Sequence, residues 1–230
     1  MSKSHLDLVL PVYNPQSGWF SVVKSGLKQL EQATAKSVRL IIVDDGSPKA
    51  AAFDELVKSD TILFVKSAQN KGKGAALRLG FAKATADIVL FTDVDFPYEI
   101  DSMKRMADAI ENGADVSLGY REDDYYASVP WFRKLLSEAF RFVLKSILKF
   151  PITDTQCGLK GMNQRGKEVF MQTTIDRFLV DMEFIKRATK NRDMKIEPVV
   201  VQLRKDVEFS SMGVGVLLTE LMNFWKIFFV

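Results

Sequence analysis

The chain has 230 residues, which is enough for one α/β domain with a substantial buried core and requires no second domain. Hydrophobic residues make up 47% of the chain and charged residues 27%, a balance that excludes wholesale disorder. The formal net charge of +3 is too small to indicate a nucleic-acid partner bound by bulk electrostatics. The single cysteine, Cys157, excludes an internal disulfide and allows a reducing compartment.

Four short apolar runs in the first half predict buried strands. They cover residues 6–13, 38–44, 61–66 and 87–92, and polar turn residues bound each of them. Two stretches between and after them show helical spacing of apolar residues: Phe20, Val23, Leu27 and Leu30, and then Met103, Met106, Ala107 and Ile110. Strands that alternate with helices predict an α/β fold, with a mostly parallel open sheet and helices on both faces.

The second half predicts a long helix over residues 131–149, which ends before Pro151, and one more strand over 195–203. No repeat, low-complexity tract or Pro/Gly linker divides the chain. We therefore expect a single domain over 1–230, with one lobe at 1–120, a second lobe at 121–212 and an apolar C-terminal helix at 213–230.

The two ends of the sequence bear on localisation. The first residues lack the apolar core and cleavage site of a signal peptide, which predicts a cytoplasmic protein. The last stretch, MGVGVLLTELMNFWKIFFV, falls short of the ~20 apolar residues that span a bilayer, and polar residues interrupt it. Three interpretations stay open for 213–230: a peripheral contact with the cytoplasmic face of a membrane, a helix packed on its own domain, or a homodimer contact.

Three polar segments lie where ligands bind in such a sheet. Asp44 and Asp45 end the second predicted strand, and a carboxylate there can accept a hydrogen bond from a nucleobase or a ribose. The segment 70–74, Asn-Lys-Gly-Lys-Gly, opens a helix and offers backbone N–H groups and charge to an anion, although it lacks the spacing of a Walker A loop. Asp93 and Asp95 follow the fourth strand and can converge on a divalent cation, Mg²⁺ or Mn²⁺. Phe96-Pro97 comes next, where phosphatases with an Asp-x-Asp pair usually have Gly-Thr.

These motifs resemble the family 2 glycosyltransferases of GT-A fold over nearly the whole chain. The matching segments are PVYN at 11–14, VDDGS at 43–47, NKGKGAALRLG at 70–80 and TDVD at 92–95. The second half is similar to the polyprenyl-phosphate branch, which includes dolichyl-phosphate glucosyltransferases and mannosyltransferases. That similarity rests on GYR at 119–121, Arg133 with Ser137, DTQCGLK at 154–160 and DME at 181–183.

The resemblance implies a role for each matching position. The nucleotide-sugar donor would bind Pro11, Tyr13, Asn14, Asp44, Lys71, Lys73 and Asp93. The metal would bind Asp93 and Asp95. An acceptor phosphate would bind Arg121, Arg133 and Ser137, which suits the bidentate geometry of guanidinium groups.

The expected reaction is a single in-line displacement at the anomeric carbon with inversion. A lipid-phosphate acceptor is already ionised near neutrality, with a second pKa of about 6. A saccharide hydroxyl is not, and would need a general base, for which Asp154 and Asp181 are the candidates and Asp154 is preferred. The Lys71–Gly74 loop resembles that of the glucosyl-type relatives more than that of the mannosyl-type ones, which implies a UDP-sugar, with GDP-mannose as the second candidate donor.

Three alternatives stay open besides transfer to a polyprenyl phosphate. The first is a glycosyltransferase that adds sugar to a saccharide hydroxyl in cell-surface polysaccharide synthesis. The second is a nucleotidyltransferase, although such enzymes usually carry their Gly-rich loop directly after the first strand, where this chain has PVYNPQSG. The third is a non-catalytic partner subunit, against which the intact Asp-x-Asp pair and basic loop argue.

Overall fold

The computed structural model describes residues 5–48, 53, 61–121, 150–152 and 154–205. Its strands are β1 (His5–Val12), β2 (Ser37–Asp44), β3 (Ile62–Lys66), β4 (Ile88–Phe91), β5 (Val116–Tyr120), β6 (Lys160–Met162) and β7 (Ile196–Val200). Its helices are α1 (Trp19–Thr34), α2 (Lys73–Phe81), α3 (Ile100–Glu111), α5 (Gln164–Met171) and α6 (Val180–Lys190). The helix expected over 131–149 and the apolar helix expected over 213–230 lie outside the described residues.

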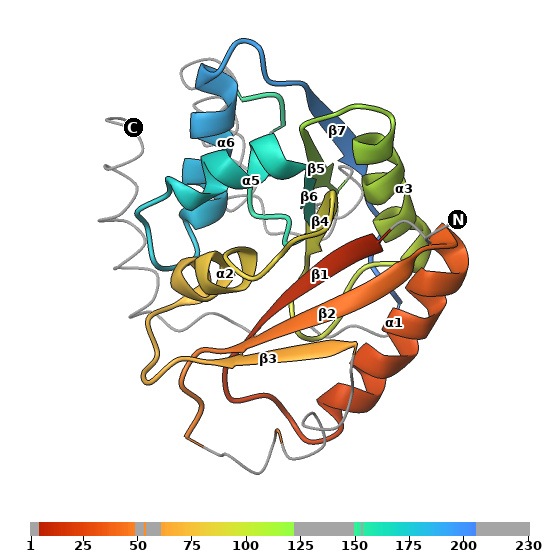
Figure 1. The fold of residues 1–230 in the computed structure, drawn as a ribbon, viewed down its shortest axis with the longest axis vertical. Helices are drawn as coiled ribbons and strands as arrows, with labels where there is room; N and C mark the ends of the chain where they lie inside the picture. Colours follow the sequence, from red (N-terminus) through yellow and green to blue (C-terminus); the bar gives the residue numbers. More distant parts are fainter. Residues whose placement is uncertain (1–4, 49–52, 54–60, 122–149, 153, 206–230) are drawn as a thin grey trace, which may run out of the picture.

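The described strands form one seven-stranded sheet in the order β3-β2-β1-β4-β6-β5-β7 (Figure 1). The pairs β1–β2, β1–β4, β2–β3 and β5–β7 are parallel, whereas β6 runs antiparallel to both of its neighbours. Strands from both halves of the chain thus share one sheet. The predicted fold class, a mostly parallel α/β sheet with helices on both faces, is confirmed.

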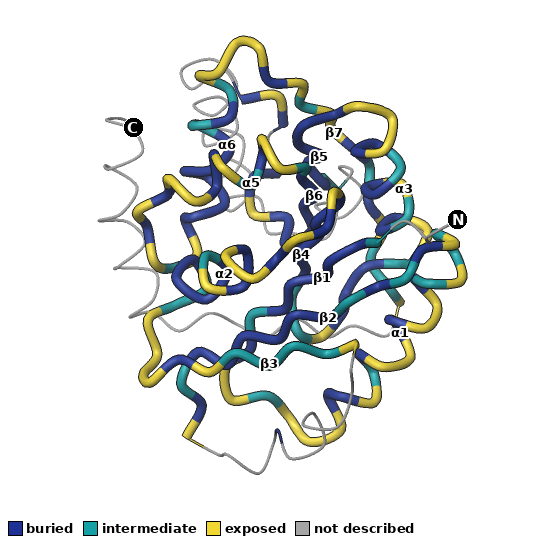
Figure 2. Tube along the Cα trace, in the orientation of Figure 1, coloured by how far each residue is buried: buried dark blue, intermediate teal, exposed yellow. Residues whose placement is uncertain are grey.

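Alternation along the strands explains the two layers of helices. On β1, Leu6, Leu8 and Leu10 belong to the hydrophobic core on one face of the sheet, and Val9 belongs to the core on the other. The first core also contains the apolar stripes of α1 and α3, and the second those of α2, α5 and α6. Figure 2 shows the buried sheet between these layers. Such strands read as continuous apolar runs because both of their faces are covered.

The direction of β6 decides which residues meet at the edge of the sheet. In parallel strands the carboxyl ends share one edge, and ligands bind there in open α/β sheets. Because β6 is antiparallel, its first residue lies at that edge, where Lys160 pairs with Phe91 at the end of β4. The segment 154–159, which precedes β6, therefore approaches the same edge as Asp44 and Asp93.

Sequence patterns found some of these elements and missed others. All five strands expected in the described part of the chain are present, with ends that differ by no more than three residues. Strands β5 and β6 and helix α5 were not anticipated, since each is short and β6 has only three residues. Among the residues described, no helix is both long enough and apolar enough to cross a membrane.

Candidate active site

The turn after β2 places two adjacent carboxylates in different environments. Oδ1 of Asp44 accepts the backbone N–H of Ser47 at 2.9 Å, while its buried Oδ2 has no hydrogen-bond partner among the described residues. Such an oxygen is costly unless something donates to it. Asp45 instead accepts the backbone N–H groups of Lys71 and Gly72, at 2.9 and 2.7 Å. Asp44 can therefore receive a ligand N–H or hydroxyl, and Asp45 holds the basic loop.

The basic loop over residues 70–74 is clamped between two backbone segments. A Cβ on Gly46 would approach the backbone of Gln69 and Asn70 to 2.5–2.7 Å, so the two turns are in direct contact. On the other side, Cβ atoms on Gly72 and Gly74 would meet the carbonyl oxygens of Asp176 and Ile175, at 2.6 and 2.3 Å. Glycine is required at these positions because the backbone approaches so closely.

Lys73, the first residue of α2, links two parts of the site. Its Nζ lies 2.8 Å from Oδ1 of Asp93 and 3.5 Å from Oδ2 of Asp181. Burial disfavours the charged ammonium, but the nearby carboxylates of Asp181 and Asp93 outweigh that effect and raise the pKa of Lys73. Lys73 therefore stays protonated and presents a positive charge at the start of a helix, where an anion is also favoured by the helix dipole.

Asp93 and Asp95 follow β4, and their properties suit a hard divalent cation. Burial and the negative charge of Asp93 raise the pKa of Asp95, as expected for two carboxylates that repel each other at close range. Gly158 makes room for this pair, because a Cβ there would lie 2.0 Å from Oδ2 of Asp93. In the described residues no group of three or more His, Cys, Asp or Glu could hold a metal. Two carboxylates still fit Mg²⁺, which commonly binds through one or two of them plus substrate phosphates and water.

Asp154 is bound by a single arginine. Nε and Nη2 of Arg121 each donate to it at 2.8 Å, one to each oxygen, and the backbone N–H of Arg121 donates at 3.0 Å. The Asp154 side chain is only 6% exposed. Although burial lowers it, the pKa of Arg121 is raised overall by Asp154. This geometry fixes the guanidinium at the carboxyl end of β5.

The first turn of α6 contributes two more buried carboxylates. Asp181 lies between two ammonium groups, since Oδ1 is 2.8 Å from Nζ of Lys160 and Oδ2 faces Lys73. Glu183 accepts the backbone N–H groups of Thr174 and Ile175 at 2.8–3.0 Å and pairs with Arg187. Glu183 thereby holds the segment that covers Gly72 and Gly74.

The end of β1 contributes Pro11, Tyr13 and Asn14, and the structure places them beside the turn after β2. The N–H of Asn14 donates to the hydroxyl of Ser47 at 2.7 Å, and Asn14 has a positive φ of 46°. Tyr13 is 51% exposed. The turn after β2 is thus hydrogen-bonded to the turn that carries the exposed Tyr13. Arg133 and Ser137 lie outside the described residues.

Sequence reasoning gave no specific role to four contributors to this region: Asp45, Lys160, Glu183 and Arg204. The first three lie in motifs that the sequence analysis quoted, whereas Arg204 lies in none of them. A weak signal existed for Lys160, since a lysine in the run Cys-Gly-Leu-Lys-Gly-Met interrupts apolar and small residues. Nη1 of Arg204 donates to the carbonyl oxygen of Phe96 at 3.2 Å, and its charge acts against the raised pKa of Asp95. Arg204 therefore holds the turn that follows the Asp-x-Asp pair.

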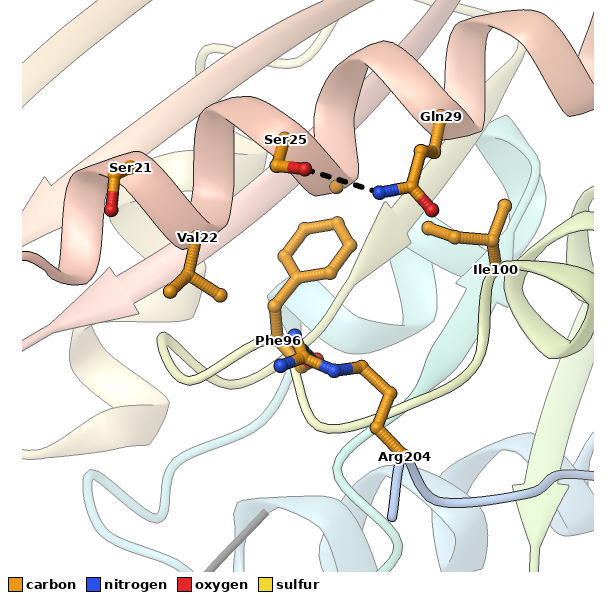
Figure 3. A pocket seen from close by; sticks show the side chains of 8 residues that line it. Ser21, Val22, Ser25, Gln29, Phe96, Ile100 and Arg204 are labelled. Carbon is orange, nitrogen blue, oxygen red and sulfur yellow. Dashed lines mark hydrogen bonds between the residues drawn. The ribbon is translucent and has the colours of Figure 1, made fainter. Parts of the chain in front are cut away.

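A pocket lies on the α1 side of that turn. Figure 3 shows the Phe96 ring beneath α1, with Arg204 beside it and Val22 and Gln29 on the helix above. The ring packs on Gly26, where a Cβ would come within 2.4 Å of it. Asp44, Lys73, Asp93 and Asp95 do not line this pocket. Phe96 and Arg204 therefore support the turn that follows the Asp-x-Asp pair on the side that faces α1.

Comparison with known proteins identifies the family that the sequence motifs resemble. The profile described as "Glycosyl transferase family 2" matches residues 7–170. Among relatives, the dolichyl-phosphate β-glucosyltransferase of Dictyostelium discoideum is 27% identical over 81% of this chain and 62% of its own length. The human protein of that name is 26% identical over 78% of this chain and 61% of its own. The dolichol-phosphate mannosyltransferase of Pyrococcus furiosus is 25% identical over 71% of this chain and 47% of its own.

Solved structures share the fold at lower identity. Mannosyl-3-phosphoglycerate synthase from Rubrobacter xylanophilus superposes with a TM-score of 0.66 at 13% identity, covering 94% of this chain and 70% of that one. Glucosyl-3-phosphoglycerate synthase from Mycobacterium tuberculosis gives 0.61 at 17% identity, covering 94% and 75%. The chain spans less than two thirds of the length of the Dictyostelium and human relatives. The profile match covers well over half of the sequence, and the chain belongs to glycosyl transferase family 2.

Proposed function

We propose that this chain transfers a sugar, with inversion, from a nucleotide diphosphate donor to a polyprenyl-phosphate-type acceptor. The observation that carries the donor half is the meeting of three groups at one edge of the sheet. These are the unpartnered oxygen of Asp44, the basic loop that contains Lys71 and Lys73, and the pair Asp93 and Asp95. This arrangement supports a donor site in which Asp44 meets the base, the loop the phosphates, and Asp93 and Asp95 the metal.

Each donor contact follows from the chemistry of these groups. Oδ2 of Asp44 is an acceptor that suits a nucleobase N–H or a ribose hydroxyl. Pro11, the exposed Tyr13 and Asn14 belong to the neighbouring end of β1, which is hydrogen-bonded to the turn after β2. Asp45 already accepts the N–H groups of Lys71 and Gly72, so the group of this loop that suits a diphosphate is Lys73, at the start of α2. A divalent cation, Mg²⁺ or Mn²⁺, when held by Asp93 and Asp95, would offset the charge of the leaving diphosphate. Positioning and charge stabilisation supply most of the rate in such a displacement.

The acceptor assignment is supported by what the two candidate bases contact. A hydroxyl acceptor needs a carboxylate that can take its proton, whereas a phosphate monoester is already ionised. Both oxygens of Asp154 accept from Arg121, and Asp181 lies between two lysines. These contacts favour a phosphate acceptor, in line with the names of the dolichyl-phosphate relatives. Arg121, together with Arg133 and Ser137, is the proposed phosphate-binding set.

The donor and the place of action belong to the same proposal. The glucosyltransferase names among the relatives support a UDP-sugar, and the mannosyltransferase name keeps GDP-mannose as the second donor. A polyprenyl phosphate lies in a membrane, so we place the reaction at its cytoplasmic face, with residues 213–230 as a peripheral contact. A homodimer remains a separate proposal.

Calorimetric titration tests the donor half. UDP-glucose and GDP-mannose are titrated into the purified protein, each with and without Mn²⁺, and into the variant Asp95→Ala. We expect UDP-glucose to bind more tightly, and only when both Mn²⁺ and Asp95 are present. Binding of GDP-mannose alone would correct the donor, and binding of neither would contradict the proposed function.

A further inference from the structure

Lys160 is a buried lysine that the proposed reaction does not use. It is the first residue of β6, and its side chain is fully buried. Its Nζ donates to the carbonyl oxygen of Cys157 at 2.6 Å and to that of Thr155 at 3.4 Å, and lies 2.8 Å from Oδ1 of Asp181. Burial of an ammonium is expensive unless it is paired, so this position calls for an explanation.

Lys160 is one end of a row of alternating charges. The row runs Lys160, Asp181, Lys73, Asp93, with distances of 2.8, 3.5 and 2.8 Å between successive charged groups. Asp181 is 2% exposed and Lys73 10%, so little solvent screens the inner members. Both ammonium groups also lie over the ring of Phe91, at 5.7 and 5.8 Å from its centroid.

The unequal distances show how the row is balanced. Lys73 is closer to Asp93 than to Asp181, although Asp181 is the more deeply buried partner. Lys160 accounts for this difference, because its charge balances Asp181 from the other side. Lys73 can therefore pair more closely with Asp93. Asp93 is also a proposed cation ligand, so Lys73 and the cation compete for one carboxylate.

We infer that Lys160 is a positioning residue that, through Asp181, sets the location of Lys73 and thereby tunes the affinity of Asp93 and Asp95 for a divalent cation. The inference rests on the proposed function, since it assumes that this pair binds the metal. It assigns Asp181 to holding the two lysines.

Opposite changes at the two ends of the Lys160–Asp181 pair should act in opposite directions. Lys160→Met removes a buried positive charge, and Lys73 moves toward Asp181 and releases Asp93. Both effects strengthen cation binding, by about tenfold for one poorly screened charge. Asp181→Asn removes a negative charge and leaves Lys73 with Asp93, so cation binding weakens by about tenfold. The double variant restores the charge balance, and its affinity should return to within about threefold of the original.

The test measures Mn²⁺ affinity by calorimetry at fixed ionic strength, with no nucleotide present, while thermal unfolding checks that each variant is folded. Lys160→Arg keeps the charge and should retain the original affinity. Lys160→Gln, which can still donate to the carbonyl oxygen of Cys157, replaces Lys160→Met if the latter does not fold. The expected result is tighter binding by the neutral Lys160 variant, weaker binding by Asp181→Asn and recovery in the double variant.

Two results would overturn the inference, and they differ in what else they overturn. If Mn²⁺ binding is abolished by Asp95→Ala but both single variants weaken it, Lys160 and Asp181 have only a structural role and the proposed metal site stands. If the unaltered protein binds no Mn²⁺, or binding survives Asp95→Ala, the metal part of the proposed function fails together with the inference.

Discussion

Two regions of the site are rich in carboxylates, and Lys73 contacts a carboxylate of each. The first region consists of the turns after β2 and β4, and the second is the first turn of α6. In the first region, Asp44 has a buried oxygen without a partner in the described chain, and the side chain of Asp93 is 40% exposed. In the second region, Asp181 and Glu183 are at most 2% exposed, and cations or backbone N–H groups surround them. Oδ1 of Asp181 likewise has no hydrogen-bond partner in the described chain, but it lies 2.8 Å from Nζ of Lys160, which balances its charge. The first region therefore keeps oxygens available to a ligand, whereas the carboxylates of the second region hold other parts of the site.

This difference distinguishes residues that bind ligands from residues that position them. A buried carboxylate whose oxygens are all satisfied stabilises its partners, whereas one with an unpartnered oxygen is costly until something donates to it. Asp44 and Asp45 show the contrast between neighbours, because Asp45 uses both of its oxygens on the loop and Asp44 uses one on its own turn. Variants in the two regions should therefore affect different measurements.

The largest effect should come from Glu183→Ala and should appear in stability. The change leaves the buried N–H groups of Thr174 and Ile175 without their acceptor and Arg187 without its partner. Loss of one member of a buried ion pair typically costs about 3–5 kcal/mol. Urea unfolding measures this, with the exposed Glu168→Ala on α5 as a matched control within about 0.5 kcal/mol of the unaltered protein. A cost below about 1 kcal/mol would mean that Glu183 does not hold this segment.

Asp44→Asn should act on nucleotide binding and leave stability nearly unchanged. The asparagine oxygen can still accept from Ser47, but an N–H₂ donor replaces the unpartnered acceptor. A hydrogen bond to a charged group contributes about 1.5–3 kcal/mol, so the affinity for the nucleotide sugar should fall about 10- to 100-fold. Calorimetric titration and thermal unfolding of the same samples separate the two effects. Unchanged affinity would show that Asp44 does not contact the nucleotide.

Gly158→Ala should weaken cation binding without touching a proposed ligand. A Cβ at this position would lie 2.0 Å from Oδ2 of Asp93, so that carboxylate must rotate away. We expect the affinity for Mn²⁺ to fall about tenfold, which corresponds to about 1.4 kcal/mol. Gly113→Ala is a comparison at a glycine with no neighbour within 4 Å, although its positive φ of 100° adds some strain. If Gly158→Ala binds Mn²⁺ as well as the original, Asp93 does not need its present orientation.

The sequence predicts the first region better than the second, for a physical reason. Asp44, Lys73 and Asp93 each follow or open a regular element, and the ends of parallel strands must meet at one edge. The contacts of Asp154, Lys160 and Asp181 depend instead on β6, a three-residue strand with no detectable periodicity. Whether β6 runs parallel or antiparallel decides if Lys160 reaches the site, and nothing in Lys-Gly-Met encodes that direction.

Burial of side chains could be foreseen, but their partners could not. Cys157 is buried as a small, weakly polar side chain commonly is, and burial raises the pKa of its thiol. By contrast, Arg121 and Asp154 are separated by 33 positions in sequence, and their bidentate pairing follows only from the ends of β5 and β6 lying side by side. Long-range pairing of this kind leaves no local pattern.

The smallest effect should distinguish the two kinds of carboxylate by the sign of their pH dependence. Burial and Asp93 raise the pKa of Asp95, so the folded chain takes up this proton more readily than the unfolded chain, and ionisation lowers stability as pH rises above the ordinary value of 3.8. Asp95 is exposed as a residue although protein atoms partly desolvate its carboxyl group, so solvent screening keeps the effect small. Asp95→Asn should therefore stabilise the protein at pH 7 by about 0.3 kcal/mol, and the gain should vanish below the ordinary pKa.

Asp115, immediately before β5, is a buried carboxylate for which the opposite sign is expected. Burial works against its ionisation, but hydrogen bonds from the backbone of Lys195 and the side chain of Asn163 outweigh it, and its pKa is lowered. Its stabilisation is present above pH 3.8 and is lost as the pH falls through the lowered pKa, so Asp115→Asn should destabilise the protein at pH 7. Urea unfolding of both variants between pH 3 and pH 7 compares them. If both variants changed the stability at pH 7 in the same direction, Asp93 and Asp95 would not repel each other enough for a bound cation to relieve the repulsion.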